Sequence, residues 1–222
     1  MTSHLSEKHL KFLNQCWPYA SGYLPLLKNS HLILYTSAEP PQDALDRMQF
    51  KSVTVRRYVD PPSSGGNEMK QMGAKRAMVD PFLKENRWFD GYDWVIRLNP
   101  DVLIRRDTWI RQTMMNTSVD GIFVDYTKNS VKGIHSDFYA FRPSTANGTA
   151  LIDNFHKRPT AETHLYSGFS DSIIRKRVAW LPGVKIHREW ARVLGKKSPV
   201  IHYHGYFKAC PHYFNATYRN IY

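Results

Sequence analysis

The chain has 222 residues, and its hydrophobic share of 42% is ample for the core of one α/β domain and excludes a disordered chain. Its formal net charge of +12 favours anionic partners, which include nucleic acids, membrane surfaces and phosphorylated small molecules. The basic residues are spread along the chain in short pairs, without a basic tail or a nucleic-acid-binding signature, so we do not expect nucleic acid as the partner.

The first third of the chain predicts one helix followed by two strands. Apolar spacing indicates a short amphipathic helix over residues 5–16, after which Pro18, Gly22 and Pro25 break the pattern. Residues 31–37 form a buried strand of parallel character. A second strand covers residues 52–59 and leads into a loop rich in proline, serine and glycine.

The remainder predicts alternating helices and strands. A helix runs over residues 67–84, and Pro81 either kinks it or splits it in two. Further strands are expected at 94–98, 102–104, 121–126, 134–142 and 178–181, and further helices at 107–115, 144–157 and 161–177. This order predicts a three-layer α/β/α sandwich with a mostly parallel central sheet.

The most informative segment is the tripeptide Asn99-Pro100-Asp101, which interrupts two apolar strands. Pro100 has no amide hydrogen, so it ends strand pairing there and fixes a turn. The side chains of Asn99 and Asp101 can then converge just beyond the carboxyl end of a strand, where ligands bind in open α/β sheets. Carboxylate and amide oxygens suit Mg²⁺ or Mn²⁺. The alternative is that both residues serve only as turn formers.

This segment resembles the metal-binding DxD segment of GT-A nucleotide-sugar glycosyltransferases. A second segment near the C-terminus resembles the His-x-x-Gly-x-x-Lys motif of glycogenin-like (family 8) transferases, with His202, Gly205 and Lys208 in register. The resemblance implies that Asp101 and His202, assisted by Asn99, bind Mn²⁺ or Mg²⁺. It also implies that glycine and lysine approach the diphosphate of a UDP-sugar donor.

The same resemblance suggests further site residues. Asp137 would contact the sugar or act on the acceptor hydroxyl, and Glu162 would touch the donor sugar or serve as base. Lys75, on the helix before the metal strand, would reach a phosphate. By position only, at the end of the first strand, Thr36 and Ser37 are candidate contacts of the nucleotide. The alternatives are a strand-start aspartate, a first-turn glutamate that the helix dipole favours, and a solvated lysine.

The expected function is therefore a metal-dependent hexosyl- or pentosyltransferase that moves a sugar from a nucleotide diphosphate to a hydroxyl of a glycan or glycoprotein. We expect one domain over residues 1–222, with a nucleotide-binding half at 31–104 and an acceptor half at 105–222. Asn99 replaces the first aspartate of the motif, and Ala209-Cys210-Pro211 replaces the usual Pro-Trp. These departures keep a catalytically inactive, glycan-binding domain as an alternative.

Two other interpretations remain open. A structural zinc module would use four candidate ligands near the C-terminus, namely His202, His204, Cys210 and His212. A nucleic-acid-binding domain, suggested by charge alone, would bind long polyanions with a steep dependence on salt.

The sequence also predicts where the protein works. No apolar run is long enough for a transmembrane helix and the N-terminus is polar, so we expect neither stable membrane insertion nor a signal peptide. The two cysteines, Cys16 and Cys210, are too few for a disulfide framework, which is typical of a reducing, cytoplasmic compartment. The aromatic tail over residues 213–222 suggests that the domain belongs to a longer polypeptide.

Overall fold

Strand β2 (His31–Thr36) is the centre of a parallel sheet with the order β1-β2-β3. It pairs with β3 (Ser52–Arg57) on one side and with β1 (Thr2–Ser3) on the other. The parallel strand predicted over residues 31–37 is confirmed, whereas the two-residue strand β1 was not predicted. The computed structural model describes residues 1–3, 5–59, 66–127, 130–183, 198–202 and 210.

The chain divides into two compact units, and each unit is built from more than one segment of the sequence. The first unit contains Met1–Val59, Asn99–Gln112 and Pro182–Tyr222, and the second contains Asp60–Leu98 and Thr113–Leu181. Besides the parallel sheet, the first unit holds an antiparallel pair of short strands, β5 (Val102–Ile104) and β9 (Val200–His202).

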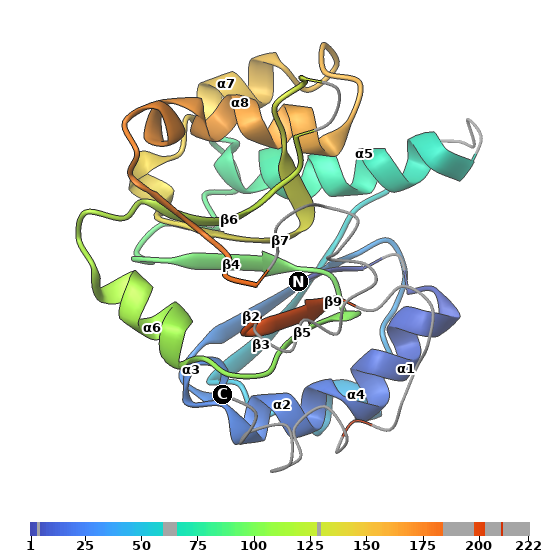
Figure 1. The fold of residues 1–222 in the computed structure, drawn as a ribbon. Helices are drawn as coiled ribbons and strands as arrows, with labels where there is room; N and C mark the ends of the chain where they lie inside the picture. Colours follow the sequence, from blue (N-terminus) through green and yellow to red (C-terminus); the bar gives the residue numbers. More distant parts are fainter. Residues whose placement is uncertain (4, 60–65, 128–129, 184–197, 203–209, 211–222) are drawn as a thin grey trace. The chain divides into compact units, whose positions relative to one another are not determined.

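Four helices of the first unit accompany its parallel sheet (Figure 1). They are α1 (Glu7–Gln15), α2 (Trp17–Tyr23), α3 (Pro25–Lys28) and α4 (Gln42–Asp46). The predicted helix over 5–16 is confirmed as α1, which buries His9, Phe12 and Leu13 on one face. The prolines that suggested a break instead stand in the first turns of α2 and α3, where a missing amide hydrogen costs nothing.

The second unit contains a mixed four-stranded sheet with the order β4-β7-β6-β8. Its strands are β4 (Val95–Leu98), β6 (Gly121–Asp125), β7 (Ile134–Phe141) and β8 (Val178–Trp180). β7 runs antiparallel to both of its neighbours, while β6 and β8 are parallel. The strands were predicted, but their spacing carries no signal for the antiparallel insertion of β7.

Helices α5 (Gly66–Val79), α7 (Gly148–Asp153) and α8 (Ala161–Ile174) lie on one side of β6 and β7 (Figure 1). Between them is a core rich in aromatic rings, which includes Phe123, Tyr139, Phe141 and Phe169. Of the kink and the split that were both open at Pro81, the structure has the split, because α5 ends at Val79 and a 3₁₀ turn (Asp80–Phe82) follows. Another 3₁₀ turn (Pro143–Thr145) precedes α7, and α6 (Thr108–Met115) precedes β6.

Among the described residues, no helix combines the length and apolar character needed to cross a membrane.

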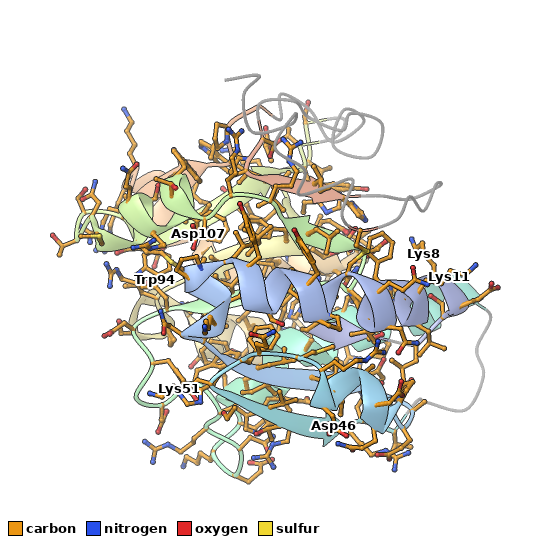
Figure 2. The ribbon with its side chains drawn as sticks, turned by 90° about the horizontal axis from the view of Figure 1, so that it is seen from below. Lys8, Lys11, Asp46, Lys51, Trp94 and Asp107 are labelled. Carbon is orange, nitrogen blue, oxygen red and sulfur yellow. A yellow bond between two sulfur atoms is a disulfide. The ribbon has the colours of Figure 1, made fainter. Side chains whose placement is uncertain are left out.

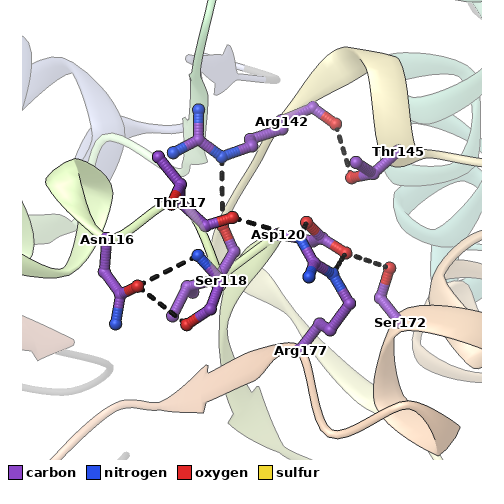
Figure 3. A network of polar contacts seen from close by, with 9 residues as sticks. Asn116, Thr117, Ser118, Asp120, Arg142, Thr145, Ser172 and Arg177 are labelled. Atoms are coloured by element: carbon purple, nitrogen blue, oxygen red, sulfur yellow. Dashed lines mark hydrogen bonds and ion pairs between the residues drawn. The ribbon is translucent and has the colours of Figure 1, made fainter.

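A buried acid fixes the end of α8 to the sheet (Figure 3). The carboxylate of Asp120, at the start of β6, accepts hydrogen bonds of 2.7 and 2.8 Å from Arg177 and one of 3.3 Å from Ser172. The backbone carbonyl of Asp120 also accepts from the amide of Arg142. Because the bidentate pair is partly buried, it holds this corner more firmly than an exposed ion pair would.

Cys16 and Cys210 form a disulfide that joins the start of α2 to the C-terminal segment. Both residues are buried within the first unit. Two cysteines are too few for a disulfide framework, and their separation of 194 positions gave no sign in the sequence that they pair. Structural disulfides are typical of oxidising compartments, so the prediction of a cytoplasmic location loses the support that it drew from the cysteines.

We expect replacement of both cysteines by serine to lower the free energy of unfolding by about 2–4 kcal/mol, because the cross-link constrains the unfolded chain. The measurement is urea denaturation with and without a thiol reductant. Reductant should destabilise the wild-type protein and leave the Cys16→Ser/Cys210→Ser variant unchanged. Equal stability of wild type and variant would show that the cross-link contributes nothing.

Candidate functional site

The tripeptide Asn99-Pro100-Asp101 forms the tight turn predicted from its proline. The amide of Val102 donates to the carbonyl of Asn99 at 3.0 Å, which closes the turn. The carbonyl of Pro100 accepts a 2.7 Å hydrogen bond from the indole of Trp17 on α2. Both ends of this bond are buried, so the turn is fixed to the helical part of the first unit.

Strand pairing then brings the C-terminal histidine to the turn. In the antiparallel register of β5 and β9, Val102 lies opposite His202. As a result, Nε2 of His202 is 3.4 Å from Oδ2 of Asp101, and both side chains are almost fully buried. These two residues, 101 positions apart, were the predicted metal ligands, and the structure places them in contact.

Helix α1 supplies two further contacts to Asp101 that the sequence analysis did not foresee. Nζ of Lys8 lies 2.6 Å from Oδ2, and Nε2 of His9 lies 3.6 Å from Oδ1. Nδ1 of His9 in turn contacts the hydroxyl of Ser3 at 3.1 Å. His9 is a polar residue on the apolar face of α1, which was the only signal in the sequence that it has a buried partner.

These contacts connect Asp101 to the carboxyl end of the parallel sheet. Ser3 in β1 lies opposite Thr36, the last residue of β2. Ligands of α/β proteins bind at such strand ends, so the position of the cluster agrees with that of a ligand site. We call Asp101, His202, Lys8 and His9 the Asp101 cluster.

The Asp101 cluster keeps its carboxylate ionised. Burial alone would raise the pKa of Asp101, but the contacts with His202 and His9 and the charge of Lys8 hold it well below its usual range. A carboxylate beside an imidazole is a donor set that Mn²⁺ accepts, so Asp101 and His202 fit a divalent cation. Lys8 contacts the same oxygen, however, and its ammonium would have to move before a cation could bind there.

Of the other residues predicted to bind the nucleotide, the structure describes Thr36, Ser37 and Asn99. Thr36 is buried, and its hydroxyl exchanges hydrogen bonds with the backbone of Ala38, while Ser37 beside it is half-buried. Asn99 is half-buried at the start of the turn. Gly205 and Lys208 lie outside the described residues.

The two catalytic candidates belong to the second unit, where they form a cluster at the start of β7. The carboxylate of Glu162 is buried and accepts a 2.7 Å hydrogen bond from the hydroxyl of Ser136. Its second oxygen, Oε2, makes no hydrogen bond with any described residue. Asp137 is half-buried, with Oδ2 3.7 Å from Nδ1 of His135. Burial raises the pKa of Tyr126, and the charges of Glu162 and Asp137 raise it further.

A close approach at Gly133 permits this arrangement. A methyl group added at Gly133 would come within 3.3 Å of both Cβ of Glu162 and Cδ1 of Tyr126. Glycine thus lets the tyrosine and the helix that carries the glutamate pack against one turn of backbone. No pattern in the sequence pointed to Ser136 or Tyr126. Ser136 reaches Glu162 because α8 packs against β7, and Tyr126 lies beside them because its backbone amide bonds to the carbonyl of Gly133.

Lys75 has a structural environment in place of the predicted phosphate contact. It is buried in the second unit, and its ammonium donates to the carbonyls of Phe155 at 3.1 Å and Arg158 at 2.5 Å. Burial also lowers the pKa of Lys75. Because the ammonium of Lys75 donates to backbone carbonyls of the segment that follows α7, we leave Lys75 out of the proposed binding site.

The zinc interpretation loses one of its ligands. Cys210 is held in the disulfide and offers no thiolate. His204 and His212 lie outside the described residues. His202 instead contacts Asp101, in agreement with a carboxylate–imidazole site.

Neither models of protein families nor characterised proteins match the sequence. Among solved structures, the chain is similar to core-mannan synthase A from Aspergillus fumigatus in its Mn/GDP form. That likeness has a TM-score of 0.52 at 10% identity and covers 81% of this chain and 71% of that one. The chain therefore has the α/β fold of glycosyltransferases, and the predicted fold class, of GT-A type, is confirmed.

A second similar structure is a glycosyltransferase involved in the glycosylation of the major capsid of PBCV-1. It matches with a TM-score of 0.43 at 7% identity, and the match covers 93% of this chain and 92% of that one. Only the first likeness is close enough to support the fold.

The environment of Lys75 generates a test of its role. We expect Lys75→Met to lower the free energy of unfolding by about 1–3 kcal/mol, because two buried carbonyls lose their donor. The exposed Lys84, changed to Met, serves as the control and should leave stability within about 0.5 kcal/mol of wild type. A Lys75→Met protein of unchanged stability with weakened nucleotide binding would restore the phosphate assignment.

Proposed function

We propose that this chain is a metal-dependent glycosyltransferase that transfers a sugar from a nucleotide diphosphate, expected to be UDP, to a hydroxyl of a glycan or glycoprotein. The observation that carries the proposal is the buried contact of 3.4 Å between Asp101 and His202 at the end of a parallel sheet. The glycosyltransferase fold supports it, and one protein of that fold is known in an Mn/GDP form.

The proposed roles follow the chemistry of each group. Asp101 and His202, with Asn99 assisting, would hold Mn²⁺ or Mg²⁺, which supplies positive charge to the departing diphosphate. Gly205 would allow close approach of the backbone to the phosphates, and Lys208 would add a point charge.

The two acids of the second unit would act on the sugar and the acceptor. Glu162 is oriented by Ser136 and retains an oxygen without a hydrogen bond to any described residue, so it can accept one from a substrate hydroxyl. Asp137 is more accessible and would contact the sugar or take the proton of the acceptor. The sugar of the donor determines whether the enzyme is a hexosyl- or a pentosyltransferase.

The function is tested by thermal unfolding with UDP, GDP and CMP, each with and without Mn²⁺. We expect a diphosphate to raise Tm only when Mn²⁺ is present. Asp101→Asn and His202→Gln should each abolish this shift, and Asp46→Asn, an exposed acid on α4 of the same unit, should retain it (Figure 2). Glu162→Gln should keep the shift but lose sugar transfer, because it lies in the other unit. Persistence of the shift in both the Asp101 and the His202 variants would refute the site.

The contact of Lys8 with Asp101 generates a second test. Because metal binding must displace the ammonium from Oδ2, we expect Lys8→Met to tighten Mn²⁺ binding about tenfold, which corresponds to about 1.4 kcal/mol. Lys11 lies on the same helix and pairs with Glu7, so Lys11→Met is the matched control and should bind Mn²⁺ as wild type does (Figure 2). Titration calorimetry measures both.

A measurement of UDP binding in the presence of a chelator distinguishes the proposed metal site from one that uses Lys8 alone. If wild type binds UDP in the presence of a chelator and Lys8→Met does not, the ammonium of Lys8 is the positive charge that binds the diphosphate. That outcome would replace the metal-dependent mechanism with a metal-independent one.

A further inference from the structure

Arg97, in strand β4 of the second unit, carries a buried charge that lacks a counterion among the described residues. Its side chain is only 6% exposed, and Nε and Nη1 are fully buried without a hydrogen bond to any of these residues. The guanidinium carbon lies 5.9 Å from the centre of the Tyr139 ring. A guanidinium is always charged, so its burial without hydrogen bonds is costly.

Tyr139 does not compensate this charge. It lies opposite Arg97 in the pairing of β4 with β7. Burial raises the pKa of Tyr139 in spite of the nearby charge of Arg97, so the phenol stays neutral at physiological pH. The ring offers a cation–π contact, which offsets only part of the cost of removing the guanidinium from water.

Arg142, in the same unit, is an arginine whose guanidinium is hydrogen-bonded within the protein, and it serves as a comparison for Arg97. Arg142 lies over the ring of Trp94 at 4.7 Å, a contact of the same kind. In addition, its Nε donates to the carbonyl of Val119 at 3.0 Å and its Nη2 to that of Met114 at 2.9 Å. Arg142 thus has its hydrogen bonds within the protein, whereas Arg97 has donors to offer.

We propose that Arg97 is the receptor for an anionic group of a ligand, either a phosphate or a carboxylate. The planar fork of arginine matches both anions, and in a buried setting such a pair is strong and selective. For a transferase, the anion would be a phosphate of the donor or the carboxylate of an acidic sugar. This role of Arg97 follows from its uncompensated charge and is independent of the metal site.

The test measures stability and anion binding in Arg97→Met and Arg142→Met by chemical denaturation at constant ionic strength. The buffer contains chloride alone, inorganic pyrophosphate or glucuronate. We expect Arg97→Met to be as stable as wild type or more stable in chloride, because it removes an uncompensated charge. The Arg142→Met protein should be less stable, because two carbonyls lose their donors.

Anion binding should show the reverse pattern. One of the two anions should stabilise wild type and Arg142→Met, and its Kd should rise at least tenfold in Arg97→Met. A response to pyrophosphate would identify a phosphate receptor, and a response to glucuronate would identify a receptor for an acidic sugar. Arg97→Lys, which keeps the charge but loses the fork, should bind with intermediate affinity.

Three results would overturn the proposal. They are a loss of stability in Arg97→Met as large as in Arg142→Met, unchanged anion binding in Arg97→Met, and failure of both anions to stabilise wild type. None of them would affect the assignment of Asp101 and His202, since the assay contains neither Mn²⁺ nor a nucleotide.

Discussion

The buried negative charge of Asp101 is the constraint on which the first unit depends. A carboxylate removed from water must be compensated, and here one ammonium and two imidazoles lie within 4 Å of its oxygens. Those groups come from α1 and β9, which lie at opposite ends of the sequence. The same charge therefore helps to hold both ends of the chain together, and it lies at the position that we propose for a divalent cation.

Several independent contacts keep this arrangement in place. Trp17 holds the carbonyl of Pro100, β5 pairs with β9, and the Cys16–Cys210 disulfide ties the C-terminal segment to α2. Each contact joins segments that are distant in sequence, and each lies within the first unit. Preorganisation of this kind lets a site bind a cation without first ordering its own ligands.

The parts of the fold that were predicted are those that local chemistry decides. Pro100 dictates the turn beside Asp101, and apolar periodicity marks β2, α1 and the two halves of the region around Pro81. The missed parts depend on tertiary pairing. Strand β9 has only three residues and exists through its pairing with β5, and no local pattern tells which acid Lys8 meets. For the same reason the sequence suggested Lys75 as a phosphate ligand, although its partners are backbone carbonyls 80 and 83 residues away.

We propose that Asp101 and His202 hold one cation, and pulsed electron paramagnetic resonance of bound Mn²⁺ can detect the imidazole among its ligands. An imidazole ligand adds a nitrogen modulation to the Mn²⁺ spectrum. We expect this modulation in the wild-type protein and in His9→Gln, which removes only the imidazole beside Oδ1 of Asp101. We expect it to disappear in His202→Gln. A spectrum of wild-type protein without nitrogen modulation, or one that His202→Gln leaves unchanged, would contradict it.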